Sequence, residues 1–367
     1  MFVAAASARP FVGAAAAAGH EVIAADLFCD AETRRDARQA YALPYADGGF
    51  DVDEVRRTLL PLLTEEDAFV YGSGFETQPE LLAEIAQRCP LWGNSPETVR
   101  TVKDPGRFFS LLARLGVPHP ETALQPPTHE IGWLAKRRGG SGGTHVRPLP
   151  AQGDYYQRAL SGRPCSLLFL ADGRGEIAVV GYNEQWVAQV PGLPYLYGGA
   201  ASQAVLPQAV QASMREAAQA LSRSLGLRGL NSLDCLVDGE RLWVLEVNPR
   251  LSATFALYDA AQRGARLFEA HRLACAGQLV APLQAEPAQA HLIYYAPFAL
   301  RVPAAVAWPA WTTDRPCGAL AVAAGQPLCS VTAQAADATA ARRLAEQRAA
   351  ELLRHIGVQA PELLNGE

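Results

Sequence analysis

Three oxygen-bearing side chains lie on two neighbouring stretches of predicted strand. Asp234 lies in residues 233–237, while Glu246 and Asn248 lie within and directly after residues 242–247. Side chains two apart on a strand point to one face, so Glu246 and Asn248 share a face. An Asp-Gly-Glu turn between the two stretches is a hairpin signal that brings Asp234 beside them. Two carboxylates and an amide suit Mg²⁺, which binds through few carboxylates together with phosphate oxygens.

A basic residue completes this group. Arg250 follows Asn248 with the same alternation and can meet a phosphate or a developing negative charge. Glu246 lies in the apolar stretch Trp-Val-Leu-Glu-Val, where a charged carboxylate is costly unless it meets a cation. That cation can be a bound metal ion. It can also be Arg250, in which case the two residues form a buried ion pair without a catalytic role.

A glycine-rich stretch lies between predicted strands at residues 131–135 and 145–147. Lys136 opens it, and the sequence Arg-Arg-Gly-Gly-Ser-Gly-Gly leads to Thr144. Backbone N–H groups there can approach phosphate oxygens because no Cβ atoms intervene. Lys136 can reach an α- or β-phosphate. The spacing is not that of a Walker A loop, and a flexible surface hairpin without a ligand is the other interpretation.

The elements that position these groups begin with alternating strands and helices. Residues 2–6 and 21–25 are predicted strands on either side of a small-residue helix at 11–18. This βαβ unit is typical of a parallel sheet with covered faces. The first turn lacks G-x-G-x-x-G, which argues against an NAD-dependent enzyme. Ser7 and Arg9 in that turn can bind an anionic ligand, or they can cap the helix and face solvent.

The rest of the chain predicts a mixture of strands and amphipathic helices. The further predicted helices are at residues 79–87, 105–115, 208–225 and 336–356, and the further strands are at 68–71, 166–170, 176–182, 291–295, 319–322 and 328–333.

Bulk composition narrows the class of protein. The 367 residues suggest two to three domains, and 49% hydrophobic residues are enough for sizeable cores. A net charge of −5 without a polybasic segment argues against a nucleic-acid partner. No apolar stretch approaches membrane-spanning length, and the N-terminus lacks the basic region of a signal peptide. Seven cysteines without a C-x-x-C pair favour reduced thiols. We therefore expect a cytoplasmic protein with no membrane partner.

Taken in order, the motifs resemble those of the ATP-grasp superfamily. The resemblance rests on Lys103-Asp104 before a helix, the glycine-rich stretch, the segment 156–162 and the Glu-Val-Asn-Pro-Arg run that ends at Arg250. It implies an α/β fold with an N-terminal parallel-sheet pre-ATP-grasp domain, followed by two α+β subdomains that sandwich ATP. The implied boundaries are 1–97 for the first domain, 98–162 for the central subdomain, 163–281 for the C-terminal subdomain with the metal site, and 282–367 for a β-rich and helical extension.

The resemblance also implies roles for individual residues. It assigns two Mg²⁺ ions, for which Mn²⁺ can substitute, to Asp234, Glu246 and Asn248, and catalytic roles to Arg250 and Lys136. The implied ATP-binding residues are Lys103, Lys136, Gly140, Ser141, Gly142, Gly143, Thr144, Gln157 and Leu160, and the candidate substrate residues are Ser7, Arg9, Glu76 and Gln185. Gln157 stands at a hinge position where the family often has a carboxylate.

The implied activity is that of a carboxylate–amine ligase, or of a related carboxylate–thiol ligase. A carboxylate attacks the γ-phosphoryl group of ATP to give an acyl phosphate, and an amine then displaces phosphate to form an amide. The products are ADP and phosphate. ATP-dependent carboxylation like that of biotin carboxylase is one alternative. A nucleotide-binding regulatory protein without turnover is another.

A narrower resemblance concerns the substrates. The Ser-Ala-Arg first turn, the Tyr-Gly-Ser-Gly-Phe-Glu segment that ends at Glu76, and Asp314-Arg315-Pro316 resemble a group of predicted ATP-dependent carboligases. Relatives in that group act on small amines and amino acids in the synthesis of one-carbon carrier cofactors of the methanofuran or tetrahydromethanopterin type. The superfamily often forms dimers, so the resemblance also implies a homodimer.

Overall fold

A five-stranded parallel sheet forms the first unit of the computed structural model, which describes all residues except 259–261, 282–286 and 359–367. The strand order is β3-β2-β1-β6-β7, and every pairing is parallel, as predicted. The strands are β1 (Phe2–Ala4), β2 (Ile23–Asp26), β3 (Gln39–Ala42), β6 (Phe69–Tyr71) and β7 (Leu91–Trp92), and the helices are α1 (Arg9–Ala17), α2 (Ala31–Asp36), α3 (Val52–Thr58) and α4 (Pro79–Ala86).

A small antiparallel sheet follows, with the order β10-β9-β11-β8. Its elements are α5 (Pro96–Lys103), α6 (Pro105–Arg114), β8 (Thr122–Ala123), β9 (Trp133–Lys136), β10 (Arg147–Pro148) and β11 (Tyr155–Arg158). The glycine-rich stretch connects the antiparallel strands β9 and β10, as the sequence predicts, although β10 is shorter than expected and starts only at Arg147.

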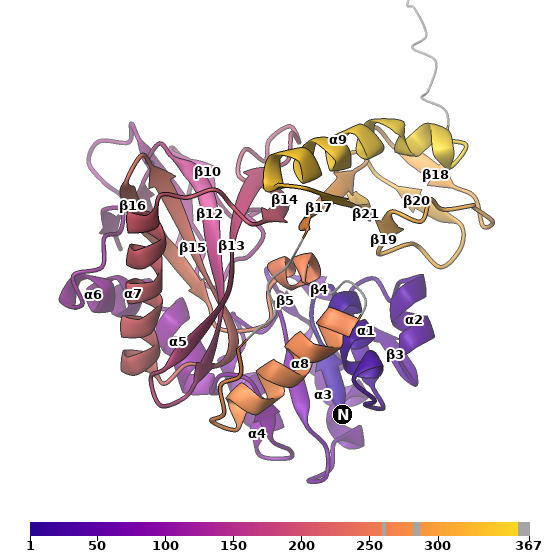
Figure 1. Ribbon diagram of the computed structural model, residues 1–367, viewed down its shortest axis with the longest axis horizontal. Coiled ribbons are helices and arrows are strands. Elements are labelled where there is room, and N and C mark those ends of the chain that lie inside the picture. The colour runs from indigo at the N-terminus through magenta and orange to yellow at the C-terminus, as the bar shows by residue number, and fades with distance from the viewer. Residues whose placement is uncertain (259–261, 282–286, 359–367) are drawn as a thin grey trace, which may run out of the picture.

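An eight-stranded sheet dominates the rest of the chain, with the order β16-β15-β12-β13-β14-β17-β21-β19. Its strands are β12 (Arg163–Asp172), β13 (Ile177–Val187), β14 (Tyr197–Ser202), β15 (Arg228–Asp238), β16 (Arg241–Asn248), β17 (Ala288–Tyr295), β19 (Thr312–Thr313) and β21 (Pro327–Ala335). Because β14 pairs with β17, the C-terminal extension continues this sheet and does not form a separate one. The helix α9 (Ala338–His355) packs on β17 and β21 (Figure 1).

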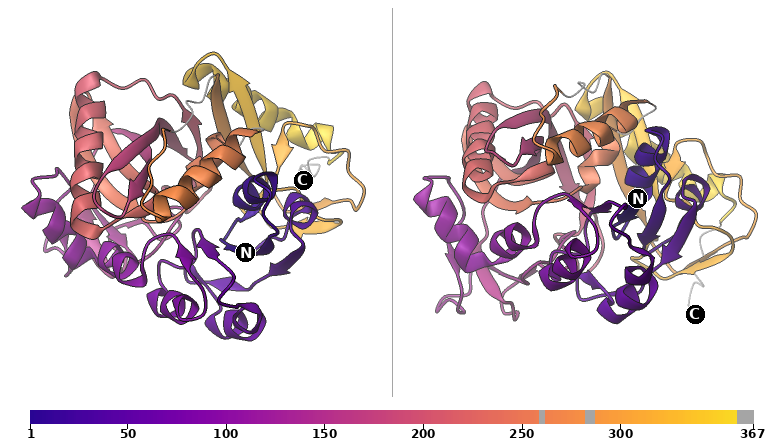
Figure 2. Two further views of the ribbon diagram at one scale, coloured as in Figure 1. Left: turned by 60° about the horizontal axis from the view of Figure 1, so that its bottom comes forward. Right: turned by 90° about the horizontal axis from the view of Figure 1, so that it is seen from below.

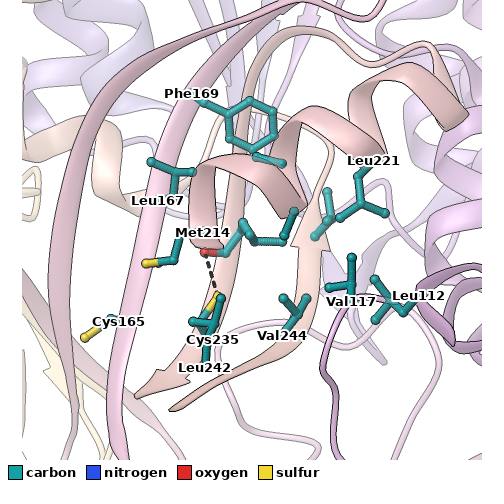
Figure 3. Close-up of a cluster of buried hydrophobic side chains, with 14 of the residues drawn as sticks. Leu112, Val117, Cys165, Leu167, Phe169, Met214, Leu221, Cys235, Leu242 and Val244 are labelled. Carbon is teal, nitrogen blue, oxygen red and sulfur yellow. Dashed lines mark hydrogen bonds between the residues drawn. The ribbon is translucent and has the colours of Figure 1, made fainter. Parts of the chain in front are cut away.

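The first half of the sheet has one apolar face and one polar face. The helix α7 (Gln208–Leu225) covers the apolar face, where Leu167, Met214 and Cys235 pack together (Figure 3). Leu233 and Cys235 both belong to this core, so Asp234 between them points to the opposite face. That alternation places a partly buried carboxylate on the side away from α7.

A helix absent from the predictions joins the large sheet to the first domain. The helix α8 (Gln262–Cys275) lies beside α1, as Figure 2 shows. Small side chains such as Ala15 on α1 meet Phe268 and Ala274 on α8 in one buried cluster. A run of alanines therefore serves as a flat packing surface. In the described part of the chain, no helix is long and apolar enough to span a membrane.

The remaining short elements include two two-stranded sheets. They are formed by β4 (Tyr45–Ala46) with β5 (Gly49–Phe50) and by β18 (Leu300–Val302) with β20 (Leu320–Val322).

The extension also contacts the edge of the first sheet directly. The backbone N–H of Ala31 donates to the Arg315 carbonyl at 2.9 Å, and Arg315 pairs with Glu32. Asp30 caps α2 by accepting from the Thr33 N–H at 2.8 Å. Burial, and then the nearby charge of Asp314, raise the pKa of Asp30 to about 7. A charged Asp30 therefore destabilises this contact at neutral pH.

Asp30→Asn is expected to raise the melting temperature at pH 8 and to give a much smaller change at pH 5. A carboxyl whose pKa is raised by folding favours the folded state below its ordinary pKa, and this contribution is lost as the pH rises from about 4 to about 7. The loss amounts to at most about 4 kcal/mol. Asparagine keeps the cap without the charge. Equal changes in melting temperature at both pH values, measured by calorimetry, would contradict this.

Candidate active site

The three predicted metal ligands lie together on the polar face of the large sheet. Asp234 is opposite Glu246 in the pairing of β15 with β16. The Asn248 Nδ2 donates to Asp234 Oδ2 at 2.9 Å. All three side chains line one cavity of about 390 Å³. The β15–β16 hairpin therefore brings these three oxygen-bearing side chains together, as the sequence pattern predicts.

Lys103 joins this group from the C-terminal end of α5. Its Nζ donates to Glu246 Oε2 at 3.2 Å and to Asn248 Oδ1 at 3.3 Å. Lys103 is buried, which is unusual for a lysine unless an acidic partner compensates it. The partner of Glu246 is thus Lys103, and the simple Glu246–Arg250 pair considered from the sequence is not formed.

Arg250 is held by a different carboxylate. Its Nε donates to Glu76 Oε1 at 2.7 Å, and its Nη2 donates to Asn248 Oδ1 at 3.1 Å. The second Glu76 oxygen accepts from the Gly74 N–H at 2.7 Å. Arg250 lines the cavity, whereas Glu76 is 3% exposed and lies behind it. The structure thus gives Glu76 the position of a group that orients Arg250, and not that of the substrate contact predicted from the sequence.

The charges of this cluster are strongly coupled. Burial raises the pKa of Glu246, but Lys103, Lys136 and His145 outweigh it and hold the pKa well below its usual range. Burial, and then the charge of Glu246, raise the pKa of Asp234. Glu246 is therefore ionised at neutral pH. Asp234 needs further positive charge nearby to be fully ionised at the same pH.

This donor set fits a hard divalent cation. Two carboxylates and an amide oxygen are ligands that Mg²⁺ accepts. Burial is the largest cause of the raised pKa of Asp234, and Arg250 and Lys103 act against it, so a further cation beside Asp234 would favour its ionised form. Among the residues that the structure describes, no group of three or more His, Cys, Asp and Glu side chains gathers as a metal site. The candidate site thus depends on the amide oxygen of Asn248 as its third donor, and this oxygen accepts from Lys103 and Arg250 in the present arrangement.

The glycine-rich loop packs closely against the segment before β14. The Tyr197 N–H donates to the Gly142 carbonyl at 2.9 Å. Gly143 has φ +74°, and a Cβ on it would lie 1.8 Å from the Tyr195 carbonyl oxygen. Ser141, Gly142 and Thr144 line the cavity, while a Cβ on Gly140 would lie 2.3 Å from the His145 ring. Gly140 and Gly143 thus allow the close packing that presents the other three residues.

Gly143→Ala is expected to weaken ATP binding about tenfold, because the new Cβ displaces the loop from Tyr195. Gly116→Ala, after the end of α6 and outside the cavity lining, is the matched control. Gly116 also has a positive φ of +67°, but a Cβ there meets nothing within 4 Å. The two variants therefore carry a similar backbone strain and differ in the clash. Calorimetric titration with ATP measures the effect, and equal affinities of the two variants would contradict the role of the close packing.

Lys136 and Gln157 face each other across the small sheet. The Lys136 Nζ donates to Gln157 Oε1 at 2.8 Å. Gln157 is 1% exposed, and its Nε2 has no hydrogen-bond partner among the described residues. Burial lowers the pKa of Lys136. A buried donor beside a partly buried lysine fits an acceptor on a bound nucleotide. Leu160 lies in the segment that follows β11. Its predicted contact with ATP stays a prediction.

The predicted substrate residues divide into two groups. Ser7, Arg9 and Gln185 line the cavity, and Glu76 does not. The Gln185 Nε2 lies 3.5 Å from Asp234 Oδ1, so it is close to the metal candidates. The Arg9 Nε donates to Asp314 Oδ1 at 2.8 Å.

Two cavity residues from the extension were missed by the sequence analysis. Asp314 and His291 line the cavity beside Arg9. Asp314 lies in the Asp-Arg-Pro sequence that contributed to the narrower resemblance. No local pattern indicated that this segment contacts the first domain. His291 begins a predicted strand and carries no local signal of function.

A comparison with protein families matches residues 103–254 to the ATP-grasp domain. The matched segment starts at Lys103 and ends at Thr254, so it contains the glycine-rich loop and the whole charged cluster. The large chain of carbamoyl phosphate synthase from Kocuria rhizophila is 28% identical over 240 residues, which cover 58% of this chain and 22% of that protein. The chain thus spans about a fifth of the length of this curated relative.

Solved structures match nearly the whole chain. The biotin carboxylase domain of the Hydrogenobacter thermophilus 2-oxoglutarate carboxylase, solved with MgADP and bicarbonate, gives a TM-score of 0.71 at 12% identity and covers 96% of this chain and 89% of that one. N5-carboxyaminoimidazole ribonucleotide synthetase from Thermotoga maritima gives a TM-score of 0.66 at 14% identity, with 95% and 97% covered. At these identities the likeness concerns the fold, and that fold includes the C-terminal extension.

Proposed function

We propose that this chain, whose residues 103–254 match the ATP-grasp domain, is an ATP-dependent carboxylate–amine ligase of the ATP-grasp superfamily. One observation carries the proposal. Two carboxylates, an amide and an arginine line a single cavity, and a buried lysine, Lys103, joins them by hydrogen bonds. This arrangement suits the charge of a transferring phosphoryl group, for which positioning and electrostatic stabilisation supply most of the catalysis.

Asp234, Glu246 and Asn248 would hold Mg²⁺, in our proposal as two ions for which Mn²⁺ can substitute. A metal ion held there would supply positive charge against the phosphates of bound ATP. Lys103 and Lys136 supply further positive charge beside Glu246, since both lower its pKa. Ser141, Gly142 and Thr144 of the glycine-rich loop line the same cavity.

Arg250 would stabilise the negative charge that develops in the two chemical steps. In the first step, a carboxylate oxygen of the substrate bonds to the γ-phosphorus as the bond to ADP breaks. In the second step, an amine nitrogen bonds to the carbonyl carbon, phosphate leaves, and the amine loses a proton to solvent. Glu76 and Asn248 fix the guanidinium before substrate binds, so little reorganisation is needed.

The choice of an amide-forming reaction is supported by the motif resemblance. Two similar proteins, carbamoyl phosphate synthase and N5-carboxyaminoimidazole ribonucleotide synthetase, have names that are consistent with C–N bond formation. The narrower part of the proposal, small amines or amino acids as substrates in one-carbon carrier cofactor synthesis, is supported by the motif resemblance alone. A cytoplasmic location and a homodimer are parts of the same proposal.

ATP-dependent carboxylation is the second candidate, because biotin carboxylase domains share the fold. The test is to measure ADP release with a panel of carboxylates and amines, alone and in pairs, and with bicarbonate. The ligase proposal predicts that ADP release requires a carboxylate and an amine together, with an amide of matching mass. ADP release that requires bicarbonate would support carboxylation instead. Unchanged ADP release across the whole panel would contradict both.

A further inference from the structure

The cavity extends well beyond the predicted metal ligands. Its lining includes Asp234 and Arg250, whereas Lys136 and Gln157, which are predicted to bind ATP, do not belong to its described lining. Much of the remaining wall comes from the first domain and from the C-terminal extension. The part of the cavity away from Asp234 is therefore available to a substrate rather than to the base of ATP.

The first domain lines this part of the cavity with residues that follow its central strands. Ser7 follows β1, Ser73 follows β6, and Leu27 and Phe28 follow β2. The carboxyl ends of neighbouring parallel strands meet at one edge of a sheet, which is where open α/β sheets bind ligands. Leu27 and Phe28 are 37% and 47% exposed, so this edge presents uncovered apolar surface.

The extension lines the same cavity with one face of β17. Gln185, Ala200 and His291 lie opposite one another across β13, β14 and β17, so they point to one face. Ile293, two residues after His291, shares this face and also lines the cavity. The Gln185 Nε2 lies 3.5 Å from Asp234 Oδ1, so the face continues from the metal candidates to Ile293.

The charged side chains in this part of the cavity compensate one another. The Arg9 Nε donates to Asp314 Oδ1 at 2.8 Å, and both side chains are largely buried. The His291 Nε2 lies 3.8 Å from Asp314 Oδ2. Breaking a buried ion pair is costly, so a charged ligand group is disfavoured here. Uncovered apolar surface, in contrast, is stabilised when an apolar group covers it.

We propose that the carboxylate substrate is an apolar acid, with its carboxylate at Arg250 and its hydrocarbon body against Leu27, Phe28 and Ile293. The inference rests on the proposed ligase function, because it names the class of one substrate. The reaction needs the carboxylate beside the γ-phosphoryl group, and Arg250 lines the cavity in contact with Asn248. From there the body of the acid extends along the cavity toward the extension. The first domain and the extension together select the acid by the polarity of its body.

The test is calorimetric titration of the full chain with short acids, in the presence of Mg²⁺ and a non-hydrolysable ATP analogue. Hexanoate adds two methylene groups to butyrate and should bind about tenfold tighter, because each buried methylene group favours binding. Adipate carries a second carboxylate at the far end of the same chain and should bind at least about tenfold more weakly than hexanoate. Hexylamine has a similar body without a carboxylate and should also bind more weakly than hexanoate.

Two variants and a matched control locate the apolar wall. Leu27→Asn and Ile293→Thr should each reduce the preference for hexanoate over butyrate at least about threefold, since a polar group replaces part of the wall. Leu62→Asn should keep the preference. Leu62 also belongs to the first domain and is 39% exposed, but it lies outside the cavity lining. Melting temperatures show that the variants remain folded.

Equal affinities for butyrate and hexanoate would overturn the inference, as would adipate or hexylamine that binds as tightly as hexanoate. An unchanged preference in both Leu27→Asn and Ile293→Thr would overturn it too, because the acid would then bind elsewhere. Binding of hexanoate that depends on this wall, without ADP release from ATP with any amine of the panel, would count against the proposed ligase function only.

Discussion

Replacing Glu246 by Gln is expected to lower the rate of ATP turnover at least about a hundredfold, because metal stabilisation of transferring phosphoryl charge is worth several kcal/mol and about 1.4 kcal/mol corresponds to tenfold. Glu246 is held ionised by Lys103 and Lys136 and faces Asp234 on the neighbouring strand. A glutamine side chain at this position would keep the shape but remove the charge. Steady-state ADP release with and without added Mg²⁺ measures the effect.

The control for this variant is Glu240→Gln, which removes an exposed carboxylate from the same hairpin. It should leave turnover unchanged. Melting temperatures of both variants show that Glu246→Gln still folds, although Lys103 loses a partner at 3.2 Å. A folded Glu246→Gln variant with wild-type turnover would show that Asp234, Glu246 and Asn248 do not form the metal site.

Arg250→Lys is expected to lower kcat about a hundredfold while the KM for ATP changes little, since the loss of one fixed donor to developing charge typically costs about 100- to 1000-fold. Arg250 uses Nε for Glu76 and Nη2 for Asn248 at the same time. A lysine keeps the charge but has a single ammonium and no planar fork, so it cannot satisfy both partners and still face the cavity. Initial rates at varied ATP concentration separate kcat from KM.

The companion variant Glu76→Gln tests how Arg250 is positioned. Burial opposes ionisation of Glu76, but Arg250 and Lys103 outweigh burial and lower its pKa. Glutamine keeps an acceptor for the guanidinium without its charge, so Glu76→Gln should lose less activity than Arg250→Lys. A larger loss in Glu76→Gln, or a raised KM for ATP with unchanged kcat in Arg250→Lys, would contradict an oriented Arg250 that acts on the reacting groups.

The parts that were predicted from sequence depend on short-range patterns. The two-residue alternation of Glu246 and Asn248, and the turn that brings Asp234 beside them, are local properties of one hairpin. The glycine-rich loop and the helix α7 were likewise visible, because glycine runs and helical periodicity act over a few residues. These patterns therefore predicted most of the polar side chains that line the cavity around Asp234, Glu246 and Asn248.

The parts that were missed depend on contacts between distant segments. Lys103 and Glu246 are separated by 143 residues, and Arg9 and Asp314 by 305. The pairing of Arg250 with Glu76 also joins separate units. No local pattern encodes such contacts. Sequence reasoning therefore assigned Glu76 to the substrate and gave no role to the extension that supplies Asp314 and His291.

The most direct test of the ligase account follows oxygen from the carboxylate substrate into phosphate. The protein is incubated with ATP, Mg²⁺ and the carboxylate and amine that together support ADP release in the panel. The carboxylate group of the first substrate is labelled with oxygen-18. The account predicts ADP, an amide, and one labelled oxygen in the released phosphate, because the carboxylate oxygen bonds to the γ-phosphorus. Formation of AMP and pyrophosphate, or of phosphate without label, would contradict it.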